Sequence, residues 1–194
     1  MHIIQSMNLR ESLIQIIKER SFCSSSEPKF KLVSGALSNF YFNMKKTTQS
    51  PEGMHLVGRL VFEKIKELGL RPDGIGGLTM GADPVAYAVS MYSYIMKEPI
   101  QAFVIRKGPK EHGLKLPIEG NVKQGNHVVI VDDVVTTGGS TIKAVNLAKE
   151  YGLIVDAVIV LVDRCEQNGR QNIEALGCPV YDILTLNDFI PAKN

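Results

Sequence analysis

Apolar residues after position 73 fall into short runs separated by longer amphipathic stretches. The runs predict strands over residues 74–77, 102–106, 128–132, 155–162 and 180–184. The stretches predict helices near residues 83–97, 142–151 and 172–176, and an earlier helix is expected from its N-cap Ser50 to Gly69. Short β-branched runs such as residues 128–131 are typical of strands buried on both faces of a parallel sheet. The alternation therefore predicts an α/β fold, with a parallel sheet, right-handed crossovers and flanking helices.

The first fifty residues follow a different pattern. Residues 1–20 mix charged and apolar side chains at helical spacing, which predicts an amphipathic helix. Residues 30–34 and 40–44 are short β-like runs around Gly35, and they predict a hairpin outside the main sheet. We expect one domain over residues 1–194, in which residues 1–50 form a helix and hairpin hood and residues 51–194 form the core.

Composition and charge narrow the class of protein. A chain of 194 residues, 44% of them hydrophobic, is long enough to bury a sizeable core. A formal net charge of +2 is too small to indicate nucleic acid as the main partner. Cys23, Cys165 and Cys178 are far apart and odd in number, which indicates neither a disulfide framework nor a zinc site. No apolar stretch is long enough for a signal core or a bilayer span, so we expect a cytoplasmic protein without membrane contact.

The most informative segment is VVIVDDVVTTGGST, residues 128–141. The carboxyl end of a buried parallel strand is where a ligand should lie, and this strand ends in Asp132 and Asp133. Hydroxyl and glycine residues follow at the start of a helix, where N–H groups and the helix dipole favour a phosphate. The two carboxylates repel a phosphate, but they accept hydrogen bonds from ribose hydroxyls or hold a magnesium ion. The segment therefore predicts a sugar-phosphate site.

Each of these features alone has an ordinary structural explanation. A Thr, Gly and Ser cluster between a strand and a helix is usually a capped loop, and adjacent acids are usually a solvated strand end. The segment is not a Walker A loop, since no Gly-Lys-Ser/Thr follows. It is not a dinucleotide fingerprint, because Gly138 and Gly139 are adjacent.

Two further segments fit the same edge of the sheet. Taken alone, the segment GGLTMGAD, residues 76–83, fits a tight strand–helix turn as well as it fits a phosphate-binding loop. Because it is expected beside the acid pair, we interpret it as a second phosphate loop. The stretch IRKGPKEHGLKLPIEGNVKQG, residues 105–125, predicts a mobile polar loop, which in most proteins is only a solvated basic loop. Its basic side chains would also suit a lid that closes over a departing anion and neutralises it.

The segment from Asp132 to Thr141 resembles the phosphoribosyl-pyrophosphate (PRPP) motif of the type I phosphoribosyltransferases. Three more segments resemble one of their families, orotate phosphoribosyltransferase. FKLVSGALSNFYFNMKK (residues 30–46) is similar to its orotate-side hairpin, RKGPKEHG (106–113) to its catalytic loop, and VDRCE (162–166) to the segment with its orotate-binding arginine. The resemblance implies the type I fold and magnesium-dependent transfer of the 5-phosphoribosyl group from PRPP to orotate. The products would be orotidine 5′-monophosphate, for UMP synthesis, and pyrophosphate.

The resemblance also implies the site residues. The catalytic set is Arg106, Lys107, Lys110, His112, Asp132 and Asp133. The PRPP-binding set is Arg106, Lys107, Lys110, His112, Asp132, Asp133, Val134, Val135, Thr136, Thr137, Gly138, Gly139, Ser140 and Thr141. The orotate-binding set is Lys31, Tyr41, Phe42, Thr136 and Arg164. The resemblance implies no certain protein ligand for a metal ion, since PRPP itself would supply most of the ligands of the Mg²⁺ ion. The ion would lie near Asp132 and Asp133. A homodimer is implied, in which the catalytic loop of one subunit reaches the site of the other.

Physical chemistry also supports the orotate-binding role of Arg164. The residue follows an apolar strand, and its guanidinium suits a planar carboxylated pyrimidine. The alternative is an ordinary surface arginine at a strand end. The chain departs from the family where many members have Lys at Val33, Arg at Ala36 and Lys at Met80. Lys31, two residues before Val33 on the same strand face, would reach the same anion.

These departures leave two alternatives open. One is a catalytically weak regulatory paralogue that binds PRPP or a nucleotide as an effector, and the other is a purine or xanthine phosphoribosyltransferase. The complete acid pair and basic loop disfavour a regulatory paralogue. The hairpin and the segment RKGPKEHG disfavour a purine or xanthine transferase.

Overall fold

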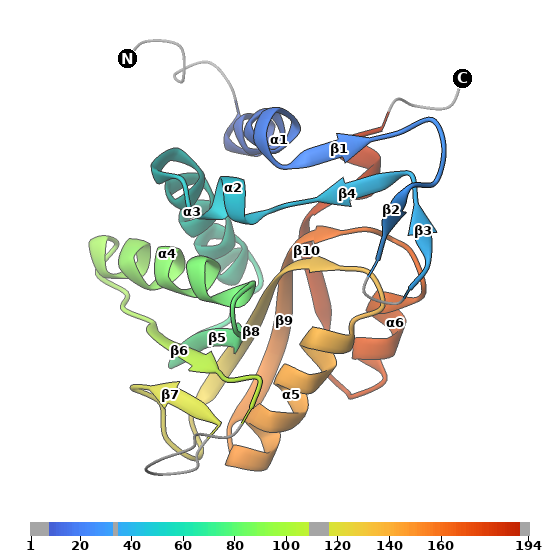
Figure 1. The fold of residues 1–194 in the computed structure, drawn as a ribbon. Coiled ribbons are helices and arrows are strands. Elements are labelled where there is room, and N and C mark those ends of the chain that lie inside the picture. The colour runs from blue at the N-terminus through green and yellow to red at the C-terminus, as the bar shows by residue number, and fades with distance from the viewer. Residues whose placement is uncertain (1–7, 33–34, 109–116, 191–194) are drawn as a thin grey trace.

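The structure is a computed structural model and describes residues 8–32, 35–108 and 117–190. Figure 1 shows the order of its elements. The helices are α1 (Leu9–Arg20), α2 (Lys45–Thr48), α3 (Pro51–Glu67), α4 (Ala82–Ile95), α5 (Gly139–Tyr151), α6 (Gly169–Glu174) and the 3-10 helix η1 (Leu186–Asp188). The strands are β1 (Phe22–Ser24), β2 (Phe30–Lys31), β3 (Leu37–Ser38), β4 (Phe40–Phe42), β5 (Gly74–Leu78), β6 (Gln101–Ile105), β7 (Ile118–Gly120), β8 (His127–Val135), β9 (Ile154–Asp163) and β10 (Val180–Thr185). None of the helices in these ranges has the length and apolar character needed to cross a membrane.

The central sheet has six strands in the order β10-β9-β8-β5-β6-β7. All neighbouring strands pair in parallel except β6 and β7, which are antiparallel. The α/β fold with a parallel sheet flanked by helices is therefore confirmed, with one antiparallel edge strand that the sequence pattern did not predict. The sequence of β7 is only Ile-Glu-Gly within a polar loop, so it has no apolar run that would mark it.

Both faces of the sheet are buried. Val129 and Val131 of β8 belong to the core cluster that includes Val61 of α3, whereas Val128 and Ile130 belong to a second cluster with α5. Figure 1 shows α3 and α4 on one side of the sheet and α5 and α6 on the other. Alternate residues of one strand thus face two helical layers, which explains the uninterrupted apolar run. Because the described helices cover both faces, we expect a ligand at the strand ends.

The pairing predicted for the N-terminal hairpin is wrong. Phe30–Lys31 pairs with Leu37–Ser38, and Phe40–Phe42 pairs instead with β1, which the sequence pattern missed. Aromatic packing explains the second pairing: the ring centroid of Phe42 lies 5.0 Å from that of Phe22 and 5.1 Å from that of Phe189. We call strands β1 to β4 the hood. As expected, they lie outside the main sheet.

Candidate functional site

A cleft of about 580 Å³ opens at the carboxyl ends of β5 and β8. Its walls come from the β5–α4 turn, the β8–α5 loop, the hood, α2, the chain after β6 and Arg164 after β9. Segments that lie far apart in the sequence therefore meet at the edge of the sheet where the strand order predicts a ligand.

Asp132 organises the loop that follows it. Its side chain is buried, and its Oδ2 accepts hydrogen bonds of 2.7 Å from both Ser140 Oγ and Thr141 Oγ1. Its Oδ1 accepts the backbone N–H of Asp133 at 3.0 Å. Burial raises the pKa of Asp132, and these hydrogen bonds act in the opposite direction. Asp132 thus ties the first turn of α5 to the end of β8.

Asp133 has fewer protein donors and lies more open to the cleft. Its Oδ1 accepts the backbone N–H of Val134 at 2.8 Å. Burial, followed by the negative charge of Asp132, raises the pKa of Asp133 to about 7. A carboxyl group in a cleft that titrates near neutral pH is typical of functional sites.

The loop between β8 and α5 is shorter than the sequence pattern suggested. Because β8 continues to Val135 and α5 begins at Gly139, the acid pair belongs to the strand and only residues 136–138 form the loop. Gly138 has φ +80°, and a Cβ there would lie 2.8 Å from the carbonyl oxygen of Gly169. At Gly139 a Cβ would meet only Thr137 Oγ1, at 3.6 Å. The backbone at the start of this 13-residue helix is therefore accessible to an anion.

The β5–α4 turn lies directly against the acid pair. A Cβ at Gly81 would be 2.8 Å from Asp133 Oδ1 and 3.1 Å from Asp132 Oδ1. Thr79 and Met80 line the cleft with Gly81, and the Thr79 hydroxyl donates to Asp83 Oδ2 at 2.6 Å. Two loops suited to anions thus flank one pair of carboxylates.

Arg164 joins the core to the hood. Its side chain is only 3% exposed, and its Nη2 donates to Ser38 Oγ at 2.9 Å and to the Phe40 carbonyl oxygen at 3.3 Å. The same nitrogen lies 2.8 Å from Glu166 Oε2. Arg164 lines the cleft, as its place after β9 predicts, and its buried Nε has no partner in the structure. Contacts within the protein therefore hold the guanidinium in place.

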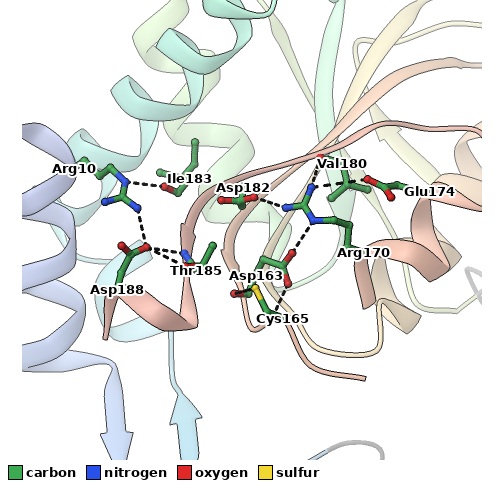
Figure 2. A network of polar contacts seen from close by, with 10 residues as sticks. All are labelled: Arg10, Asp163, Cys165, Arg170, Glu174, Val180, Asp182, Ile183, Thr185 and Asp188. Atoms are coloured by element: carbon green, nitrogen blue, oxygen red, sulfur yellow. Dashed lines mark hydrogen bonds and ion pairs between the residues drawn. The ribbon is translucent and has the colours of Figure 1, made fainter. Parts of the chain in front are cut away.

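A polar network supports the turn that carries Arg164 (Figure 2). Arg170 donates from Nε to Asp163 Oδ2 at 3.1 Å and forms a close ion pair with Asp182. The other oxygen of Asp163 accepts the backbone N–H of Cys165 at 2.8 Å. Since Asp163 is 3% exposed, these bonds fix a buried carboxylate on one side of Arg164.

The two aromatic residues of the hood have different environments. Tyr41 is 42% exposed, lines the cleft and stacks on Phe30 with ring centroids 5.8 Å apart. Phe42 is 8% exposed; it reaches the cleft, but its ring packs in the core. Lys31 lines the cleft from β2. The ring of Phe42 is thus ordinary core packing.

Within the segment of residues 132–141, two residues of the predicted PRPP-binding set, Val135 and Thr141, do not line the cleft. Val135 is 2% exposed and belongs to the core cluster of α5, because the strand continues through it. Thr141 is 1% exposed, and its hydroxyl is directed to Asp132. Thr141 contacts Asp132, which lines the cleft, and the Val135 carbonyl oxygen accepts the backbone N–H of Arg164 at 3.0 Å. The other cleft-lining members of the set are Val134, Thr136, Thr137, Gly138, Gly139 and Ser140.

The basic loop is described only at its start. Lys107 lines the cleft, and its carbonyl oxygen accepts a hydrogen bond of 2.9 Å from Lys143 Nζ. Arg106 does not line the cleft; its guanidinium pairs with Glu119 of β7 at 3.2 Å. Lys110 and His112 lie outside the described residues, as does Val33.

The cleft also contains a lysine that the sequence reasoning did not select. Lys45 begins α2, a helix of four residues and too short for a periodic pattern, and it lines the cleft. The available signal was the pair of lysines that ends the hairpin-like segment FYFNMKK.

Comparisons with known proteins agree with this geometry. A sequence profile of the phosphoribosyl transferase domain matches residues 44–185. The orotate phosphoribosyltransferase of Aquifex aeolicus is 48% identical over 181 residues, which cover 93% of this chain and 97% of that relative. Among solved structures, Mycobacterium tuberculosis H37Rv orotate phosphoribosyltransferase in complex with Fe(III) dicitrate has a TM-score of 0.80 at 33% identity and covers 94% of this chain and 99% of its own. The same enzyme in complex with PRPP has a TM-score of 0.74 at 29% identity, over 96% of this chain and 95% of its own.

Proposed function

Because this chain belongs to the orotate phosphoribosyltransferase family and transfers the 5-phosphoribosyl group from PRPP to orotate, we propose that the cleft beneath the hood is where the transfer occurs. The observation that carries the proposal is the contact of the Gly81 turn with both carboxylates of the acid pair. The comparisons give no support to a regulatory paralogue or to a purine transferase.

PRPP fits the order of groups along the cleft. The N–H groups and hydroxyls of residues 136–140 suit the 5′-phosphate at the start of α5. In this proposal Asp133 accepts a hydrogen bond from a ribose hydroxyl, because Asp132 already accepts hydrogen bonds from Ser140 and Thr141. The turn at residues 79–81 suits the pyrophosphate. The ribose would lie between two anion sites with its hydroxyls toward the acid pair.

Magnesium fits this arrangement as a partner of PRPP. The described residues contain no group of three or more side chains that could cage a metal ion. Mg²⁺ is usually bound by one or two carboxylates together with substrate phosphates and water, and the acid pair supplies such carboxylates. When bound, the ion would neutralise charge on the pyrophosphate.

The transfer itself is a displacement at ribose C1 through an oxocarbenium-like state. In our proposal, the acid pair orients the ribose, while Lys107, Lys110 and His112 of the basic loop stabilise the departing pyrophosphate, with His112 as a proton donor. Closure of the loop would exclude water and protect PRPP from hydrolysis. Positioning and electrostatic stabilisation would account for most of the rate.

Orotate would enter between the hood and the end of β9. Arg164 and Lys31 line this part of the cleft and suit the orotate carboxylate. Tyr41 and Thr136 line the same space. Since Arg164 Nη2 already binds the hood, the base would contact the remaining accessible part of the guanidinium.

We also infer a cytoplasmic homodimer with shared active sites. Two symmetric loops reaching across a twofold axis would complete both clefts at once. The proposed function as a whole is tested by incubating the protein with PRPP, orotate and Mg²⁺ and detecting orotidine 5′-monophosphate by mass spectrometry, with Asp133→Asn as the comparison. Equal product from both proteins would place the transfer outside this cleft.

A further inference from the structure

Lys45 is a cation of the cleft that the proposed mechanism does not use. It is exposed at the start of α2, whereas the preceding Met44 is 1% exposed. The hydroxyl groups of Thr47 and Ser21 form a buried hydrogen bond of 2.7 Å. The helix is thus anchored in the core on one side and presents Lys45 to the cleft on the other.

Lys45 lines the same cleft as the acid pair and the β5–α4 turn. Burial and the charge of Asp132 raise the pKa of Asp133, and the charge of Lys45 is among the influences that lower it. The same Asp133 carboxylate lies against Gly81. Lys45 therefore acts on the part of the cleft where, under the proposed function, the bond from ribose C1 to pyrophosphate breaks.

Besides Lys45, the cleft is lined by Lys107 of the basic loop and by Lys31, which the proposed function assigns to orotate, whereas the β5–α4 turn itself supplies no cation. The turn contributes Met80, which is 55% exposed, and Leu78 lies beside it. Arg164 is engaged by Glu166 and by the hood. The structure describes no hydrogen bond or ion pair that would occupy the Lys45 ammonium, so it is available to a ligand.

We propose that Lys45 is a pyrophosphate-binding residue of this site and supplies the positive charge that the apolar Met80 does not. The inference rests on the proposed function. The ammonium contacts the pyrophosphate group of bound PRPP and continues to do so as the electron pair of the C1–O bond passes to the leaving oxygen; Lys45 keeps its proton throughout. A compact point charge with three donors suits a group that changes position as it leaves.

The test compares Lys45→Ala with Lys46→Ala. Lys46 is the next residue, has the same charge and is exposed, but it does not line the cleft. Titration calorimetry with inorganic pyrophosphate and Mg²⁺ should show binding weakened between about tenfold and a hundredfold in Lys45→Ala, the range expected for loss of one charged hydrogen bond. The KM for PRPP should rise with it, while the KM for orotate should stay near that of the wild type.

Lys45→Arg serves as the rescue variant, since it keeps the charge and should restore most of the affinity for pyrophosphate. If Lys45→Arg restores pyrophosphate binding, the loss in Lys45→Ala comes from the missing charge and not from a structural change in α2. The Arg variant also keeps the test usable if Lys45→Ala folds poorly. Pyrophosphate binding that is equal in Lys45→Ala and Lys46→Ala would overturn the inference, as would failure of folded Lys45→Arg to bind better than Lys45→Ala. If the wild type makes no orotidine 5′-monophosphate, the proposed function fails instead.

Discussion

The Arg164 guanidinium donates a hydrogen bond of 2.9 Å to the Ser38 hydroxyl, although 126 positions separate the two residues. The bond joins the turn after β9 to strand β3 of the hood. Because the same arginine lines the cleft, one side chain joins the hood to the wall of the cleft.

Arg164→Ala should weaken orotate far more than PRPP. The substitution removes the expected contact with the orotate carboxylate, and loss of a charged hydrogen bond costs about 2–3 kcal/mol. Ser38→Ala is the matched control, since it removes one of the two hydrogen bonds from Arg164 to the hood and leaves the guanidinium in place. Calorimetry with both substrates measures the difference. Equal weakening of PRPP and orotate in Arg164→Ala would show that the residue only holds the hood.

Asp133→Asn should abolish transfer and stabilise the protein above neutral pH. The pKa of Asp133 is raised to about 7 in the folded protein and lies near 3.9 in an unfolded chain. The raised pKa favours the folded state below pH 4, and this contribution is lost as the pH rises to 7. At pH 8 the Asn variant should therefore be more stable by about 1–2 kcal/mol, with little gain at pH 4.

Urea unfolding of both proteins at pH 4 and pH 8 measures this gain. Glu63→Gln, on the exposed surface of α3, is the control and should show no comparable rise at pH 8. The activity of the wild type should fall as the pH drops below about 7, because Asp133 then loses its charge. An Asn variant that is less stable than the wild type at pH 8 would contradict the account of Asp133.

The strands of the core could be predicted from the sequence because their runs of apolar residues indicate burial. Residues 128–131 are apolar because helices cover both faces of the sheet, and the fold follows from the alternation of such runs. The end of β8 could not be predicted in this way. Val134 pairs with Val162 and Val135 with Asp163, so the strand continues beyond the acid pair, where the apolar pattern stops.

The hood and α2 were less accessible to sequence reasoning. Strands of two or three residues carry no period, and their partners are chosen by distant contacts such as Phe42 with Phe189 and Ser38 with Arg164. The motifs located most of the cleft, since Asp133, the following loop and Arg164 all lie in it. They did not select Lys45, because a four-residue helix places it there.

Arg170→Ala should destabilise the protein by about 3 kcal/mol, because it leaves the buried Asp163 without its ion pair (Figure 2). Arg59→Ala is the control: Arg59 pairs with Glu63 on the surface of α3, where an ion pair contributes about 0.5 kcal/mol. Denaturant unfolding monitored by circular dichroism gives both values. Similar losses for the two variants would mean that the Asp163 network adds no more stability than a surface pair.

Lys110→Ala and Asp133→Asn should complement each other if two subunits share each site. Either variant alone leaves every site without one essential group. A mixed dimer contains one site with both lesions and one with neither, so random exchange should restore about a quarter of all sites. Activity that stays absent, although native mass spectrometry detects mixed dimers, would mean that each subunit closes its loop over its own cleft.

The central claim is that the cleft transfers the phosphoribosyl group to orotate. The most direct measurement is pyrophosphate release from PRPP and Mg²⁺ in parallel reactions with orotate, hypoxanthine, xanthine or no base. The account predicts release that depends on orotate and is abolished by a magnesium chelator. Release with hypoxanthine or xanthine but not with orotate would contradict it.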